Sequence, residues 1–310
     1  MTTIANSYQV KFHNNVELVL QQATAGNPLD SAVVWTDDAG SSKVKVRDIF
    51  AAKRAKEATE RHGRTVWDDP DNDGVWIPKP NELYEAFLID NQDQLATSIA
   101  LQGAATQVTA ATINRARIQR VLEGFYGPII SGRDGTVTTP LGATGEVAAT
   151  VGGASGAQPL NTAKLRAAKV YLGENFNMKG VKRYMVLTEE DNDALLDEVP
   201  ATSTDFQRAY GAHVDENGNL MRMLGFEFIH IELDDPNLGS VPGLATNGSG
   251  YRRNPFWVHG GLTANYWQRL RSEVGKIPEL RFNLGTFAGT TLAATRTQAG
   301  RAGTILNLKA

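Results

Sequence analysis

The sequence predicts an α+β fold, in which one long helix precedes strands and helices that alternate. Three observations lead to this prediction. Residues 93–126 stay compatible with a helix for longer than any other stretch. Tyr184–Leu187 is a short apolar run, followed directly by a sequence typical of a helix start. Residues 281–310 alternate strand-like pieces with glycine turns, so we expect the chain to end in a sheet.

The helix predicted over Asp93–Tyr126 carries apolar residues at steps of three and four, the spacing of one buried stripe. Gly127 and Pro128 end it, because glycine accepts a left-handed cap and proline cannot continue a helix. The pattern fits a strut and an ordinary core helix equally well. The stripe consists of Leu101, Ala104, Val108, Ala111, Ile118, Leu122 and Phe125, with Arg115 interrupting it and Arg117, Gln119, Arg120 and Glu123 mostly on the other side.

Composition excludes several classes of function. Of 310 residues, 41% are hydrophobic and 21% charged, which is ordinary for a folded protein of one or two domains. The net charge of -3 and the lack of a basic run argue against sequence-specific nucleic-acid binding. Without cysteine there is no disulfide, thiolate nucleophile or Cys-ligated zinc. No apolar run reaches membrane-spanning length and no signal peptide is evident, so we expect an intracellular product with no membrane partner.

The first part of the chain looks divided by excursions. Residues 1–28 form a polar arm, in which Val16, Val19 and Leu20 can share a helical face. Ser31–Thr36 and Lys43–Arg47 are predicted as two strands about a turn, with valines on one face of the second.

The chain between this ribbon and the long helix is highly charged. Phe50–His62 is predicted as a solvated helical projection, and Thr65–Pro80 as an acidic loop whose tryptophans form an interface or a small core. Leu83–Ile89 then leads into the long helix, which Asp90 or Asn91 can cap.

The second part of the chain is predicted as an α/β region after a glycine-rich stretch, residues 127–159, that holds one strand pair or is a mobile linker. Asn161 or Thr162 caps a helix through Phe176 with Leu165, Ala168 and Leu172 on one side. The further predicted elements are a helix ending near Glu198, a helix over Thr202–Tyr210, a turn at Asp215–Gly218, a central strand over Phe226–Leu233 and strand-like pieces at Phe282–Leu284, Thr290–Ala293 and Thr304–Leu308.

Two groups of residues suggest a metal site. Asp69-Pro70-Asp71-Asn72-Asp73-Gly74 matches the first half of a calcium-binding EF-hand loop, but Pro80 stands where the bidentate glutamate is needed, so a solvated acidic turn is favoured. His230, Glu232 and Asp234 alternate along a predicted strand and could face a metal, although a polar strand end is the simpler interpretation.

No pattern indicates an enzyme. The nucleophile elbow G-x-S-x-G and both glycine-rich phosphate-binding patterns are absent from the sequence. We therefore predict no catalytic residue, no cofactor and no metal. The other histidines, His13, His62, His213 and His259, are scattered without a partner in the sequence.

The order of elements resembles the major capsid proteins of tailed double-stranded-DNA bacteriophages, the Hong Kong 97-type fold. The most similar stretches are LNTAKLRAAKVYLGENFNMKGVKRYMVLTEEDNDALLDE, residues 160–198, and NLMRMLGFEFIHIEL, residues 219–233. The resemblance implies an N-terminal arm at 1–30, an extended loop at 31–80, a peripheral domain with a spine helix at 81–159, an axial domain at 160–275 and peripheral closing strands at 276–310.

The resemblance implies a structural protein that self-assembles into the pentamers and hexamers of an icosahedral phage head enclosing double-stranded DNA. Its implied partners are copies of itself, packaged DNA through non-specific contact, and scaffolding, portal and decoration proteins. The chain has no room for a long cleaved scaffolding segment, so a separate scaffold or none is expected. Assembly in the host cytoplasm and a final place in the virion follow. An encapsulin-like protein compartment and, less favoured, a metal-dependent enzyme using His230 and Asp234 remain as alternatives.

In some members of this family, Lys–Asn isopeptide bonds link the subunits covalently. Lys53 and Lys56 lie in the implied extended loop, but residues 52–64 are crowded with charge, whereas such a bond needs a desolvated lysine. We therefore expect a shell without covalent bonds between its subunits.

Overall fold

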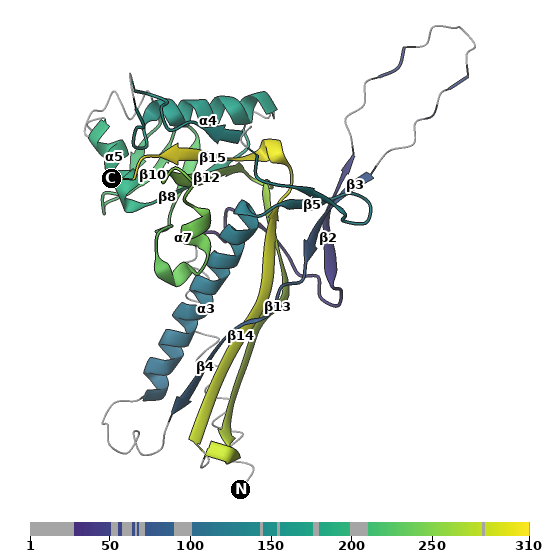
Figure 1. The fold of residues 1–310 in the computed structure, drawn as a ribbon, viewed down its shortest axis with the longest axis vertical. Coiled ribbons are helices and arrows are strands. Elements are labelled where there is room, and N and C mark those ends of the chain that lie inside the picture. The colour runs from purple at the N-terminus through teal and green to yellow at the C-terminus, as the bar shows by residue number, and fades with distance from the viewer. Residues whose placement is uncertain are drawn as a thin grey trace.

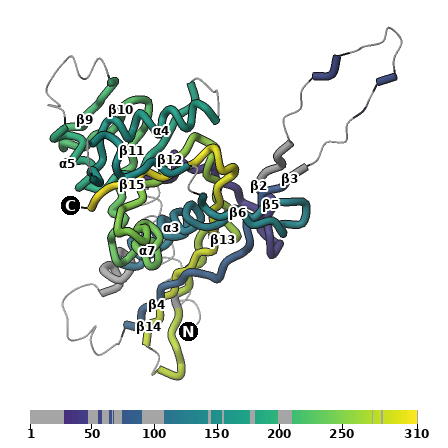
Figure 2. Tube along the Cα trace, turned by 45° about the horizontal axis from the view of Figure 1, so that its top comes forward, coloured from purple at the N-terminus to yellow at the C-terminus, as the bar shows by residue number. Residues whose placement is uncertain are grey.

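The computed structural model confirms the predicted mixture of helices and strands (Figure 1). A seven-stranded sheet carries helices α4 and α5, the long helix α3 and a four-stranded sheet extend from it, and a second four-stranded sheet with shorter strands projects to one side (Figures 1 and 2). The described residues are 28–50, 55–57, 64–65, 67, 72–89, 101–142, 145–153, 156–175, 180–198, 210–280 and 283–309. The interpretations of most of the N-terminal arm, of His13, Lys53 and His62, of the caps at 90–91 and of the helix over 202–209 lie outside them.

The seven-stranded sheet contains the two strands predicted as apolar and central. In β8, Tyr184 and Val186 face one hydrophobic cluster, whereas Met185 and Leu187 face another on the side of α4 and α5. Burial on both faces explains the uninterrupted apolar run. The strand order is β7 (Glu146–Val147), β15 (Ala302–Asn307), β12 (Arg252–Val258), β8 (Arg183–Leu187), β11 (Phe226–His230), β10 (Leu220–Met223) and β9 (His213–Val214).

Local capping residues start the two helices that cover this sheet. For α4 (Thr162–Asn175), Asn161 Oδ1 accepts a hydrogen bond from the Lys164 amide at 2.9 Å, as an N-cap does. For α5 (Glu189–Glu198), the Thr188 hydroxyl donates to Asp191 Oδ2 at 2.7 Å, within the predicted capping box. Both helix starts are confirmed.

Helix α3 (Leu101–Tyr126) ends where Gly127 and Pro128 predict, but the stripe expected to be buried is wrong in part. Val108 and Ala111 are exposed, whereas Ile113 and Arg117 are buried. A Cβ atom at Gly124 would lie 2.2 Å from the Ala294 carbonyl oxygen, so the helix touches β14 at this glycine. The helix face that contains Gly124 therefore packs against β14. The hydrophobic pattern of the sequence alone does not predict this face.

The second sheet has the order β1 (Val34–Thr36), β13 (Leu262–Ile277), β14 (Asn283–Arg296) and β4 (Leu83–Ile89). One face of β14 packs on α3 through Ala288, which contacts Ala110 and Ile113. The pieces predicted at 282–284 and 290–293 belong to one long strand, because β14 pairs with β13 along its length and with β4 over Leu284–Thr290. Leu83–Ile89 is likewise a strand, with alternate residues exposed.

The third sheet projects away from the other two and has the order β2 (Lys43–Phe50), β3 (Asn72–Pro78), β5 (Ile129–Ser131) and β6 (Val137–Thr139). The predicted ribbon of 31–36 and 43–47 is wrong, because β1 pairs in parallel with β13 and β2 pairs with β3. The strand pair expected within 127–159 is confirmed as β5 and β6. Of the helix expected over 50–62, Phe50 instead ends β2, and residues 55–57 are exposed and not helical.

Candidate functional site

The three residues considered for a metal do not come together. Strand β11 ends at His230, whose Nε2 lies 3.1 Å from the Leu220 carbonyl oxygen. Glu232 accepts the Glu189 amide at 2.7 Å, while Asp234 pairs with Arg252. Within the described part of the chain, no group of three or more His, Asp or Glu side chains is placed to hold a metal ion.

The acidic loop resembling an EF-hand is described only in its second half. Asn72 and Gly74 belong to β3, where they pair with Phe50 and Asp48 of β2. These backbone groups therefore serve a sheet rather than a loop that wraps an ion. Among the other candidates, Lys56 and the histidines His213 and His259 lie at exposed positions.

A buried charge cluster around Arg252 is the feature that the sequence did not reveal. Arg252 is 3% exposed and pairs with Asp234 at 2.9 Å and with Glu190, while Thr188 Oγ1 accepts from it at 3.0 Å. Burial alone would raise the pKa of Asp234, but hydrogen bonds and charge from Arg252 and Lys309 hold it below its ordinary value. The cluster joins α5, β12 and the end of the chain.

A second buried group fastens residues 28–36, here called the strap, to the long helix. Arg117 of α3 donates to Asp30 at 3.0 Å and to the Tyr266 hydroxyl at 2.7 Å. Burial raises the pKa of Asp30, against the opposing charge of Arg117. Trp35 stacks on Tyr266 with ring centroids 4.7 Å apart. The strap therefore holds helix and sheet in one arrangement.

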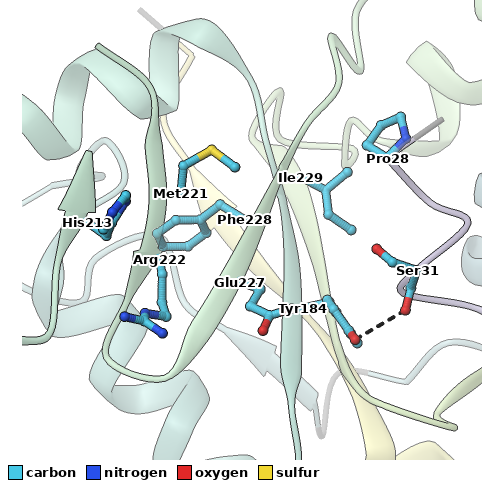
Figure 3. A pocket seen from close by; sticks show the side chains of 9 residues that line it. All are labelled: Pro28, Ser31, Tyr184, His213, Met221, Arg222, Glu227, Phe228 and Ile229. Atoms are coloured by element: carbon cyan, nitrogen blue, oxygen red, sulfur yellow. Dashed lines mark hydrogen bonds between the residues drawn. The ribbon is translucent and has the colours of Figure 1, made fainter. Parts of the chain in front are cut away.

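A pocket of about 480 Å³ opens where the strap crosses the seven-stranded sheet (Figure 3). The Tyr184 hydroxyl donates to the Ser31 carbonyl oxygen at 3.2 Å, the one bond drawn among the lining residues. Glu227 points into this region and pairs at 2.9 Å with Lys182. The lining mixes apolar and charged groups without a nucleophile and base in contact, which is not the arrangement of an acid–base active site.

Exposed apolar side chains gather on the outer face of the β13–β14–β4 sheet. We call Tyr84, Leu88, Ile277 and Leu280 the tip patch. Tyr84 is 66% exposed and Leu88 51% exposed. Ala86, Leu88, Ile277 and Leu280 line a hollow of about 440 Å³, at whose floor Gly285 leaves room for the Ile277 side chain. Trp67 is 87% exposed. Exposed apolar surface of this kind is typical of protein–protein contacts.

None of the helices that the structure describes is both long and apolar enough to cross a membrane. The described residues thus offer projecting surfaces and buried ties, but no assembled catalytic group.

Comparisons with known proteins agree with a structural role. A family model described as phage capsid protein matches residues 4–309. The capsid of Ralstonia phage GP4 superposes with a TM-score of 0.62 and 9% identity, over 90% of this chain and 87% of that one. The cyanophage Pam1 capsid gives a TM-score of 0.61 and 12% identity over 90% and 91%, and Mycobacterium phage Che8 gives 0.57 and 14% over 86% and 85%. A search of curated proteins finds no match. The chain belongs to the phage capsid protein family.

Proposed function

We propose that this chain is a major capsid protein, which assembles with copies of itself into the pentamers and hexamers of an icosahedral phage head enclosing double-stranded DNA. The family match over residues 4–309 and the similarity of the fold to phage capsids support the proposal. The role is structural rather than enzymatic. Scaffolding, portal and decoration proteins are further proposed partners, with assembly in the host cytoplasm and a final place in the virion.

We propose the Hong Kong 97-type division of the chain for this fold. Residues 1–30 form the N-terminal arm, 31–80 the extended loop, 81–159 the peripheral domain with α3 as spine helix, 160–275 the axial domain and 276–310 the closing strands. The projecting β2–β3 pair supports the extended loop. Strand pairing suggests two refinements of these bounds. Strand β15 would belong to the axial domain, because it pairs with β12, and β13 would belong to the peripheral domain, because it pairs with β14.

The observation that carries the proposal is the apolar surface on the two projecting parts. Trp67 lies on the segment between β2 and β3, and the tip patch lies on the far face of a sheet whose other face is covered by α3. A lone subunit gains nothing from exposing these side chains, while a neighbouring copy can cover them. Many modest contacts of this kind, repeated by symmetry, can hold a closed shell.

Electron microscopy of the purified full-length chain, with and without a scaffold, tests the proposal. We expect closed shells of uniform size, and double-stranded DNA inside particles taken from phage. Monomers or small open oligomers under all assembly conditions would contradict it. Shells that carry protein cargo and no DNA would instead support a compartment of the encapsulin type.

A further inference from the structure

The chain contains two asparagines that precede a glycine, Asn217 and Asn247. At such a pair the glycine nitrogen can attack the asparagine carboxamide and expel ammonia, because glycine has no Cβ atom to obstruct the approach. The product is a five-membered succinimide ring, which water then opens. The two sites share this local sequence, so a difference in their reactivity must come from the structure around them.

Asn247 lies in the loop between α7 (Val241–Leu244) and β12, where two backbone amides hold its carboxamide oxygen. Oδ1 accepts hydrogen bonds from the Ser249 amide at 3.0 Å and from the Tyr251 amide at 2.8 Å. When the carboxamide carbon is attacked, negative charge develops on this oxygen. Two N–H donors that already point at the oxygen stabilise that charge, as in an oxyanion hole. The loop therefore activates the carboxamide of Asn247 toward attack.

The attacking atom, the Gly248 nitrogen, keeps its N–H group available. Gly248 is exposed, and its amide donates no hydrogen bond to any residue that the structure describes. The loop is closed by its neighbours, since the Asn247 amide donates to the Tyr251 carbonyl oxygen at 2.9 Å and the Gly250 amide to the Asn247 carbonyl oxygen at 3.0 Å. Hydroxide can therefore remove the proton from the Gly248 nitrogen without breaking a hydrogen bond of the loop.

The surroundings of Asn217 have the opposite effect on the same reaction. The Gly218 amide donates to the Asp215 carbonyl oxygen at 3.0 Å, so this hydrogen bond must break before the nitrogen can attack. The Asn217 Nδ2 group lies 3.3 Å from Asp215 Oδ2. The negative charge of that carboxylate disfavours both the deprotonated amide and the oxyanion. The turn at Asp215–Gly218 therefore protects Asn217.

We propose that Asn247 is a site of spontaneous deamidation and that Asn217 is protected from it. The Gly248 nitrogen loses its proton to hydroxide and attacks Asn247 Cγ, so that a new N–C bond forms. The bond from Cγ to Nδ2 breaks, and Nδ2 takes up a proton from water and leaves as ammonia. Water then adds to a carbonyl carbon of the succinimide and opens the ring to aspartate or isoaspartate. The exposed loop before β12 gains a negative charge, and the reaction does not depend on the proposed assembly.

Peptide mapping by mass spectrometry of the folded full-length protein, held at pH 7 and at pH 9, tests this site. Trypsin cleaves after Arg222, so the two asparagines fall in different peptides and their rates are measured in one sample. Asn247 should deamidate at least roughly fivefold faster than Asn217, the factor that corresponds to one net hydrogen bond. The rate should rise with pH, because hydroxide removes the Gly248 proton. Equal rates, or faster conversion of Asn217, would overturn the proposal.

Two controls separate the effect of the loop from that of the sequence. Gly248→Ala should suppress conversion of Asn247, and a Cβ atom at this position meets no other atom within 4 Å, so the variant keeps the loop. In the unfolded protein, held in denaturant at the same pH, the rates at Asn217 and Asn247 should become similar. Undiminished conversion of Asn247 in the alanine variant, or the same preference for Asn247 in denaturant, would contradict the proposal.

Discussion

At the scale of single residues, Arg117 and Arg252 are buried cations that join segments far apart in the chain. Arg117 connects α3 to the strap and to β13, and Arg252 connects β12 to α5 and to Asp234. Leaving one partner of such a pair buried without the other is costly, because the remaining charge has lost its solvent and its counter-ion. The main effect of these two arginines is therefore to hold the connected segments in one relative position, rather than to bury apolar surface.

Replacing Arg117 by methionine should lower the free energy of unfolding by about 3 kcal/mol, since Asp30 and the Tyr266 hydroxyl lose their partner. Denaturant unfolding of the assembly-free subunit measures this. Arg120→Met is the control, because that residue pairs with Glu123 on the partly exposed side of the same helix and should cost less than about 1 kcal/mol. Equal losses in the two variants would show that Arg117 is no special tie.

Stability should fall in acid through Asp234. Its pKa lies below the ordinary 3.8, so the unfolded chain binds the proton first as pH falls. The stabilisation is fully present above about pH 4 and is lost as pH drops through the folded-state pKa. Thermal melts between pH 6 and pH 2.5 should show a shallower acid dependence for Asp234→Asn than for the natural chain. Identical pH dependence of the two proteins would show that Asp234 does not contribute to the loss of stability in acid.

At the scale of elements, Gly124 decides which face of α3 meets β14. Gly124→Ala should destabilise the subunit by roughly 1–3 kcal/mol, although alanine favours helix, because the new methyl group meets the Ala294 backbone at 2.2 Å. Gly173→Ala in α4 is the matched control, with no atom within 4 Å of the added group, and should gain up to about 1 kcal/mol. Unfolding curves give both values, and destabilisation by both would mean that helix context alone is responsible.

The tip patch should matter for assembly and not for folding. Leu88→Ser should change the free energy of unfolding by less than about 0.5 kcal/mol, because the side chain is half exposed in the subunit. Shell yield, measured by sedimentation, should fall strongly. Val170→Ser, at an exposed position on α4, is the control and should leave the yield unchanged. An unchanged shell yield for the Leu88 variant would show that the tip patch is not a subunit contact.

At the scale of the whole molecule, local sequence signals predict helices and strands but not which strands pair with each other. Helix ends and the central strands β8 and β11 follow from caps, glycines and apolar runs, which act within a few residues. The pairing of β1 with β13 does not, because Thr36 and Asn265 are 229 positions apart and neither stretch marks the other. The clusters around Arg117 and Arg252 were missed for the same reason, since isolated arginines resemble surface residues.

The assembled shell should dissociate into single chains in hot detergent. Between subunits we expect apolar burial and no covalent bond, so boiled particles should run as one band near 33.6 kDa. A ladder of multimers that survives boiling would show bonds between subunits.

The tip patch combines two parts of the chain that are far apart in the order of synthesis. Tyr84 and Leu88 are synthesised early, and Ile277 and Leu280 late. The two parts meet only when β4 pairs with β14, where Thr286 contacts Phe87 across 199 positions. Contacts this distant form slowly. An unfinished or misfolded chain therefore cannot display the complete patch, so the lattice would admit only subunits that have already folded. If the tip patch is a subunit contact, as proposed, it also selects folded subunits for assembly.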